Sequence, residues 1–105
     1  MNLIFKALSD PTRRQVLELL RKGPMSAGEL AEHFSVSKPT MSAHFAVLRQ
    51  AGLIEAQRQG KSIIYELRLS VLEDALLSFA RVFGWTLQDS GQVGSKPSRA
   101  QPGRR

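Results

Sequence analysis

Residues 26–52 read SAGELAEHFSVSKPTMSAHFAVLRQAG and contain the starts of two helices, separated by a short turn. Ser26 is followed three residues later by Glu29, a capping box that typically opens a helix. Ser37 is suited to cap a second helix, and Gly52 is suited to end it. Two short helices joined by a tight turn are typical of a helix-turn-helix, whose second helix enters the major groove of DNA.

The second helix, Ser37–Gln50, has one apolar and one polar side. Met41, Phe45 and Leu48 recur at helical spacing and therefore share a buried face. The opposite side carries small and polar side chains, and no acidic residue occurs from position 33 to position 54. Because a carboxylate facing phosphates would repel them, we expect this side to contact DNA. The expected contacts are Ser37, Lys38, Pro39, Thr40, Ser42, Ala43 and Arg49.

A β-hairpin is predicted directly after this helix. Leu53–Arg58 and Ser62–Leu67 are β-rich runs on either side of Gln59-Gly60-Lys61. Arg58 and Lys61 bracket the tip, and a basic tip beside a recognition helix either follows the phosphate backbone or enters the minor groove. The alternative for these two side chains is that they are solvated charges on the hairpin.

Two further helices are predicted before the helix-turn-helix. Residues 3–8 form a short apolar turn or helix. Asp10 then caps a second helix, with Pro11 in the first helical position, where its missing N–H costs nothing. This second helix is predicted to run to about Arg21.

The last predicted helix opens at another capping box, Ser70 with Glu73, and runs to about Leu87. Its apolar stripe follows a complete small domain, so we expect a dimer seam there rather than more of the intrachain core. The stripe consists of Leu72, Leu76, Phe79 and Phe83. The order of elements predicts a mainly α fold with a two-stranded β-hairpin, a dimeric winged helix-turn-helix of the order α-α-α-α-β-β-α.

Composition limits this interpretation. The 105 residues suffice for one compact domain, predicted over residues 1–87, followed by a disordered basic tail over residues 88–105. The formal net charge is +6, but the tail holds half of it, so charge alone is weak support for a polyanionic partner.

The chain has no cysteine, which excludes disulfides and thiolate metal sites and fits a cytoplasmic location. No apolar run approaches the roughly eighteen residues of a membrane-spanning helix, so no membrane insertion is expected.

Taken in order, several motifs resemble the ArsR family of bacterial winged-helix regulators. They are Asp10-Pro11-Thr12-Arg13-Arg14, Leu30-Ala31, Ser37–Phe45, Leu48–Ile54, Gly60-Lys61 and Tyr65-Glu66-Leu67, within about residues 2–85. The resemblance implies a homodimer built from the first and last helices, a palindromic operator in double-stranded DNA, and repression. It adds Leu3, Ile4 and Phe5 to the expected dimer interface and His44 to the expected DNA contacts.

The departures from the family concern metal sensing. Metal-sensing members carry a Cys-x-Cys type motif in the helix corresponding to Glu29–Phe34, or bind metal through His and carboxylates on the last helix. This chain has no cysteine, and its last helix has Glu73 and Asp74 but no histidine. The chain therefore resembles the branch of SdpR-like autorepressors. We expect no metal and no cofactor, and this branch allows release from DNA through a sequestering protein.

Two other classes of function fit the sequence less well. An enzyme would need a catalytic constellation or a Gly-rich phosphate loop, and neither is recognisable. A winged helix that binds proteins instead of DNA is expected to carry acids on its recognition face.

The roles of three side chains stay open. His44 either contacts DNA or packs near the junction of the two helices, and Arg13 and Arg14 either touch phosphates or pair with an acid or the partner chain.

Overall fold

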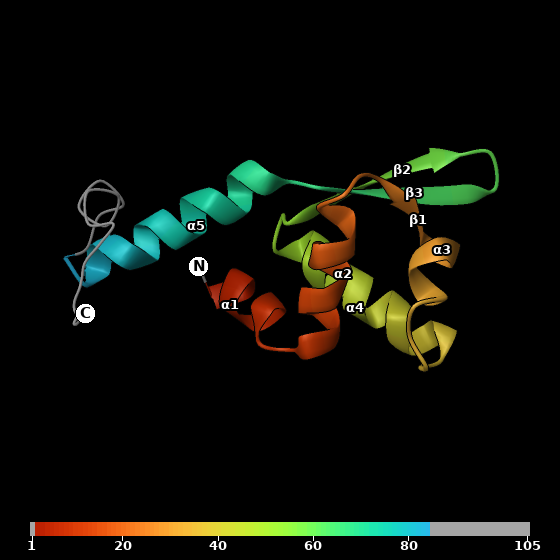
Figure 1. Cartoon of the computed structure of the whole chain (residues 1–105), viewed down its shortest axis with the longest axis horizontal. Helices are drawn as coiled ribbons and strands as arrows, with labels where there is room; N and C mark the ends of the chain where they lie inside the picture. Colours follow the sequence, from red (N-terminus) through yellow and green to blue (C-terminus); the bar gives the residue numbers. More distant parts are fainter. Residues whose placement is uncertain (1, 85–105) are drawn as a thin grey trace. The chain divides into compact units, whose positions relative to one another are not determined.

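A computed structural model describes residues 2–84 of the 105-residue chain (Figure 1). The chain divides after Leu72 into two compact units. The predicted tail, residues 88–105, and the end of the predicted last helix, residues 85–87, lie outside the described residues. The structure therefore tests the winged helix-turn-helix itself, while the predicted domain boundary at residue 87 stays a prediction.

The described residues form five helices and three strands, and the predicted order of four helices, a hairpin and a final helix is confirmed. In chain order the elements are α1 (Asn2–Leu8), α2 (Pro11–Leu20), β1 (Met25–Ser26), α3 (Ala27–Ala31), α4 (Lys38–Gln50), β2 (Ile54–Gln59), β3 (Ser62–Leu67) and α5 (Leu69–Val82). The mainly α winged-helix fold is thus the one that the sequence predicts.

The wing contains one strand that the sequence does not predict. Strand β1 pairs antiparallel with β3, with Met25 opposite Tyr65 and Ser26 opposite Ile64, and the sheet order is β1-β3-β2. The predicted two-stranded hairpin is therefore part of a three-stranded sheet. A strand of two residues is too short to show alternation, and Ser26 also carries the helix-start signal, so the local sequence hides this strand.

The predicted caps are present at the starts of α2, α3 and α4. The carboxylate of Asp10 accepts the backbone N–H of Thr12 at 2.7 Å and caps α2. At α3 the capping box is complete, because the Ser26 N–H donates to the Glu29 carboxylate at 2.8 Å and the Glu29 N–H donates to the Ser26 hydroxyl at 3.0 Å. The third predicted cap, Ser37, is also confirmed, at α4.

The end of α4 turns the chain sharply into the wing. Gly52 adopts a positive φ of 77°, a conformation that favours glycine. Its N–H donates to the Arg49 carbonyl at 2.9 Å, and the N–H of Leu53 donates to the Leu48 carbonyl at 3.1 Å. These two bonds form a Schellman motif, which ends the helix and satisfies its last carbonyls. Strand β2 consequently starts directly beside the helix that it follows.

One hydrophobic core supports both the recognition helix and the wing. Met41, Phe45 and Leu48 are buried on α4, as their spacing predicts. The ring of Phe45 lies 4.7 Å, centroid to centroid, from the ring of Tyr65 on β3. Other buried members are Ala7, Val16, Leu17, Leu20, Leu30, Leu53 and Ile54. Because α4 and the wing pack on the same core, their exposed sides are held in fixed relation to each other within this unit.

The predicted cap of the last helix is wrong. Helix α5 begins at Leu69, so Ser70 lies inside the helix instead of capping it. The carbonyl oxygen of Arg68 accepts the backbone N–H of Val71 at 3.1 Å, and the helix starts there. The Ser-x-x-Glu pattern is thus a false signal, because a helix can begin before a serine that would suit its cap.

The predicted end of this helix is also wrong. Helix α5 ends at Val82 rather than near Leu87. Gly84 adopts a positive φ of 72°, and its N–H donates to the carbonyl of Arg81 at 2.9 Å. A glycine in this conformation just past the last helical residue is the usual stop signal of a helix, and it was present in the sequence.

Tyr65 is the only tyrosine of the chain, and it is 5% exposed in the core. Burial raises the pKa of its phenol, and the charge of Arg49 opposes this in part. The stability that the neutral phenol contributes is complete below the ordinary pKa of about 10, and it is lost as pH rises through the higher folded pKa. We therefore expect the wild-type chain to lose more stability than Tyr65→Phe between pH of about 8 and about 11.

Urea denaturation at several pH values measures this difference directly, and tyrosinate absorbance follows the single phenol. Loss of charge on lysines is common to both proteins and cancels in the comparison. Parallel pH profiles for the wild type and Tyr65→Phe would contradict the prediction.

Candidate nucleic-acid interface

The exposed surface of α4 carries the predicted recognition residues. Among the side chains predicted to contact DNA, only His44 is half-buried on this helix. The exposed ones, on α4 or at its cap, are Ser37, Lys38, Pro39, Thr40, Ser42, Ala43 and Arg49. All of these side chains are thus accessible at the surface, and their contacts with DNA stay a prediction.

The N-terminus of α4 is built to face an anion. The Ser37 hydroxyl accepts the backbone N–H of Thr40 at 3.2 Å and donates to the Thr40 hydroxyl at 2.9 Å. The two hydroxyl groups are therefore hydrogen-bonded to each other, and the hydroxyl hydrogen of Thr40 remains available as a donor. No acidic residue lies in the first turn, so the positive end of the helix dipole is not neutralised by the protein.

The wing places its basic residues at the tip and its acidic residues at the base. Arg58 on β2 lies opposite Ile63, and Lys61 stands in the turn beside Gly60, whose φ is 62°. Both basic side chains are exposed, and the tip projects away from helices α1–α4 of its own unit (Figure 1). This arrangement leaves a positive end on the wing, as a phosphate contact requires.

The acidic base of the wing is partly neutralised within the protein. Glu55 and Glu66 lie opposite each other across β2 and β3, where two like charges are unfavourable. The guanidinium of Arg68 donates to the Glu55 carboxylate at 2.7 Å. This exposed ion pair offsets one of the two negative charges at the end of the wing nearest the core.

Arg13 and Arg14 have structural partners within the chain. Arg13 donates to the carbonyl of Ala7 at 2.9 Å and to that of Lys6 at 2.8 Å. Arg14 donates to the carbonyl of Leu8 at 2.7 Å. Both side chains thus bind the last carbonyls of α1, an arrangement that the sequence reasoning did not foresee. Its only signal was the position of the arginines in the first turn of α2, where long side chains point back toward the preceding segment.

Arg13 also reaches the recognition helix. Its Nη1 lies 3.2 Å from Nδ1 of His44. Desolvation acts to raise the pKa of the neighbouring Asp10, but hydrogen bonds from the backbone N–H groups of Arg13 and Thr12, together with the positive charge of Arg13, outweigh it and lower that pKa. His44 is therefore packed against a charged cluster at the start of α2, and the same side chain is partly exposed at the edge of the surface predicted to contact DNA.

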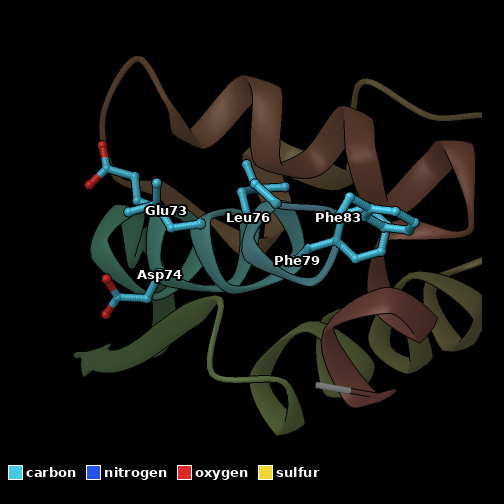
Figure 2. Close-up of a pocket in the computed structure, with 7 residues that line it drawn as sticks. Glu73, Asp74, Leu76, Phe79 and Phe83 are labelled. Atoms are coloured by element: carbon cyan, nitrogen blue, oxygen red, sulfur yellow. The ribbon is translucent and has the colours of Figure 1, made fainter. Parts of the chain in front are cut away.

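The predicted dimer seam is exposed on the second unit in the single chain. Leu76, Phe79 and Phe83 on α5 and its C-terminal turn are 50%, 43% and 71% exposed. Phe79 and Phe83 meet edge to face with ring centroids 5.1 Å apart. They line a hollow of about 690 Å³ with Leu77, Ala80 and two acids, Glu73 and Asp74, which lie at the opposite end from the rings (Figure 2).

The remaining predicted seam residues belong to the first unit and differ in exposure. Leu3 on α1 is 50% exposed. Phe5 is half-buried, and Ile4 and Leu72 pack in part against the core of their own unit. A seam that used Ile4 or Leu72 would therefore bury only the parts of these side chains that the core leaves accessible.

Within residues 2–84, no three side chains of the types that ligate metals lie close enough together to share an ion. The predictions of no metal and no cofactor stay predictions. None of the described helices has the length and hydrophobicity needed to cross a membrane.

Comparison with known proteins assigns the family. Residues 10–56 match the model of the bacterial regulatory proteins of the arsR family. Over 76 residues, the chain is 51% identical to the transcriptional repressor SdpR of Bacillus subtilis strain 168, covering 72% of this chain and 84% of that repressor. This chain belongs to the ArsR family. The resemblance seen in the sequence motifs is thereby confirmed.

Other relatives of this ArsR-family chain agree in sequence and in fold. An arsenical resistance operon repressor of Staphylococcus xylosus is 37% identical over 73 residues, which are 70% of each chain. A solved ArsR-like transcriptional regulator from Rhodococcus sp. RHA1 superposes with a TM-score of 0.71 at 30% identity, covering 79% of this chain and 78% of the other. The ArsR-family assignment therefore rests on the winged-helix fold as well as on the sequence.

Proposed function

We propose that the chain is a transcriptional repressor that binds a palindromic operator as a homodimer, with α4 in the major groove and the wing on the flanking backbone or minor groove. The observation that carries this proposal is that one unit combines the acid-free, exposed surface of α4 with a basic wing tip. The groove is wide enough for one helix, and residues near the N-terminus of such a helix reach base edges. The chain acts as a regulator and not as an enzyme, and it acts in the cytoplasm, where bacterial DNA lies.

The proposed dimer pairs the seam residues of α1 and α5 with those of a second copy. Three predicted seam side chains, Leu76, Phe79 and Phe83, are at least 43% exposed in the single chain, a clustering that marks an interaction site more often than a free surface. A two-fold dimer would present two copies of α4 to half-sites one helical turn apart, which explains why the operator is expected to be palindromic.

We further propose that release from the operator does not use a metal. SdpR is named a transcriptional repressor, and the similarity to it supports the repressor interpretation made from the sequence. Sequestration by another protein is then the release route to test. The direct experiment for the whole proposal is a gel shift with the DNA upstream of the chain's own gene and with a scrambled duplex of equal length. A discrete complex on the upstream DNA alone supports it, and equal binding to both duplexes would overturn it.

The proposed phosphate contacts predict a steep dependence of affinity on salt. Lys38, Arg49, Arg58 and Lys61 are exposed, which gives about eight phosphate contacts for a dimer. At about 0.9 counterions released per contact, the slope of log K against log salt is expected near about −7. Lys61→Ala removes two of these contacts and should reduce the slope to about −5.

Fluorescence anisotropy over a salt series measures both slopes. Because Lys61 contacts phosphates in this proposal, Lys61→Ala should weaken binding to operator and scrambled DNA by similar factors. A wild-type slope near zero would rule out the proposed contacts, and an operator-specific loss in Lys61→Ala would place Lys61 on a base instead.

A further inference from the structure

Arg13 joins three parts of the first unit through one guanidinium. Its Nε donates to the Ala7 carbonyl and its Nη2 to the Lys6 carbonyl, so two of its nitrogens hold the C-terminal end of α1. Its Nη1 is directed at the ring of His44 on α4, at 3.2 Å. These contacts leave little freedom to the guanidinium, which is planar and presents its donors in a fixed fork.

The chemistry of this contact determines where the proton of His44 resides. A guanidinium can only donate hydrogen bonds, so Nδ1 of His44 must be the acceptor and cannot carry a proton. A neutral imidazole with an unprotonated Nδ1 carries its proton on Nε2. Nε2 is therefore the nitrogen that remains to donate a hydrogen bond to a group outside this cluster.

The position of His44 on α4 places the Nε2–H donor near the residues predicted to contact DNA. His44 follows Thr40 by four residues, so the two side chains lie one turn apart on the same edge of α4. Thr40 is exposed and predicted to contact DNA, while His44 is half-buried between that surface and Arg13. A donor placed at this edge, next to the N-terminal turns of α4, is within the part of the helix that enters a groove.

We propose that Arg13 is a positioning residue, which holds His44 in the Nε2–H tautomer so that α4 presents this N–H to an acceptor atom of DNA. The proposal rests on the proposed DNA-binding function. Arg13 itself touches no DNA in this scheme. Its contribution is to orient the imidazole before binding, so that this side chain does not need to be ordered when the complex forms.

The tautomer can be measured without DNA. The chain has two histidines, and the exposed His33 serves as an internal reference. Long-range ¹H–¹⁵N correlation spectra at a pH of about 8, above the ordinary histidine pKa of about 6.5, distinguish the two tautomers. We expect His44 to be entirely in the Nε2–H form, and its signals to move toward the averaged pattern of His33 in Arg13→Met. A His44 pattern that matches His33 in the wild type, or that does not change in Arg13→Met, would overturn the proposal.

A double-mutant cycle tests the link to DNA. The probe is a duplex selected from random DNA by the wild-type protein. One net hydrogen bond is worth about 1 kcal/mol, so His44→Ala and Arg13→Met are each expected to weaken binding about fivefold. The double variant should bind more weakly than His44→Ala alone only by the loss that comes from the α1 contacts of Arg13, because the His44 contact is removed by either change. Fully additive losses would overturn the proposal.

Arg14→Met is the matched control. Arg14 also donates to a carbonyl at the end of α1 but makes no recorded hydrogen bond to His44. Its effect on binding should therefore add to that of His44→Ala. This control separates a general loss of the α1 contact from the specific loss of the His44 contact.

His44→Gln and His44→Asn give an independent reading should Arg13→Met fail to fold. The amide N–H of glutamine can occupy the place of Nε2–H, whereas the shorter asparagine places its amide near the position of Nδ1. Glutamine is expected to keep binding within about twofold, and asparagine to lose it about fivefold. The reverse order would overturn the proposal.

The binding measurements also identify the acceptor atom on DNA. Together with the spectra, they separate the proposal about Arg13 from the proposed function. A loss on selected and scrambled DNA alike indicates a phosphate oxygen, and a loss on selected DNA alone indicates a base edge. Both results support the presentation of Nε2–H. If the wild type prefers no duplex over scrambled DNA, the proposed function fails, while the spectra still decide whether Arg13 sets the tautomer.

Discussion

Replacing Ala43 with glutamate is expected to abolish operator binding and to leave the folded chain intact. Ala43 is exposed in the second turn of α4, on the surface proposed to enter the major groove. A carboxylate there would lie among phosphates and base acceptors, which would repel it. An uncompensated charge buried in an interface costs about 3–5 kcal/mol, which corresponds to a loss of affinity of a few hundredfold or more.

The fold should tolerate this change. Position 43 makes no contribution to the buried side of α4, which consists of Met41, Phe45 and Leu48. Glutamate is also a good helix former. Circular dichroism and a thermal melt are therefore expected to match the wild type, so that loss of binding reports on the interface.

Ala43→Gln separates charge from size in the same experiment. Glutamine has nearly the volume of glutamate but is neutral and can donate to base edges, so its loss should be far smaller than that of glutamate. Titration of each variant against operator and scrambled duplexes gives the comparison. Normal operator binding by Ala43→Glu would mean that α4 is not the recognition helix.

The parts of the fold that could be predicted are those specified by neighbouring residues. Asp10, Ser26 and Ser37 each cap a helix through hydrogen bonds to backbone groups two or three residues away, so the signal and its effect lie in the same short segment. The buried side of α4 follows in the same way from a period of 3.6 residues.

The parts that were missed depend on residues far apart in the sequence. Strand β1 is two residues long and exists because Met25 and Ser26 pair with Tyr65 and Ile64, about forty positions away. Nothing in residues 25–26 alone distinguishes this strand from a loop. The errors at α5 have a different origin, because Ser70 gives a false start signal and the true stop signal at Gly84 was not used.

The same difference between local and distant partners decides which features of the candidate site could be predicted. That Thr40, Ser42 and Ala43 are exposed could be predicted, since exposure follows from the helical period once the buried face is known. That Arg13 binds two carbonyls of α1 and the ring of His44 could not, because its partners lie six, seven and thirty-one positions away. Long-range polar contacts of this kind leave no periodic trace in a sequence.

Replacing Phe83 with aspartate is expected to convert the proposed dimer into monomers. Phe83 is 71% exposed in the single chain, so the change should cost the folded chain little. In a two-fold dimer each substitution occurs twice. Loss of one aromatic anchor from an interface typically costs about 2 kcal/mol or more, so two copies weaken dimerisation by about 4 kcal/mol, or roughly a thousandfold.

Sedimentation equilibrium over a range of protein concentrations measures this shift. The matched control is Gln15→Asp, which adds the same charge at an exposed position of α2 outside the proposed seam. A change in the association constant for Gln15→Asp equal to that for Phe83→Asp would indicate a general charge effect, and an unchanged dimer in Phe83→Asp would place the seam elsewhere.

The same variant should lose operator affinity, although Phe83 lies far along the chain from α4 and no proposed DNA contact is altered. A dimer binds its second half-site as an intramolecular step at high effective concentration, and a monomer loses this advantage. Phe83→Asp should therefore bind an operator no more tightly than it binds an isolated half-site. The wild type should prefer the complete palindrome by at least about a hundredfold. Equal preference in the two proteins would show that each α4 recognises DNA independently of the dimer.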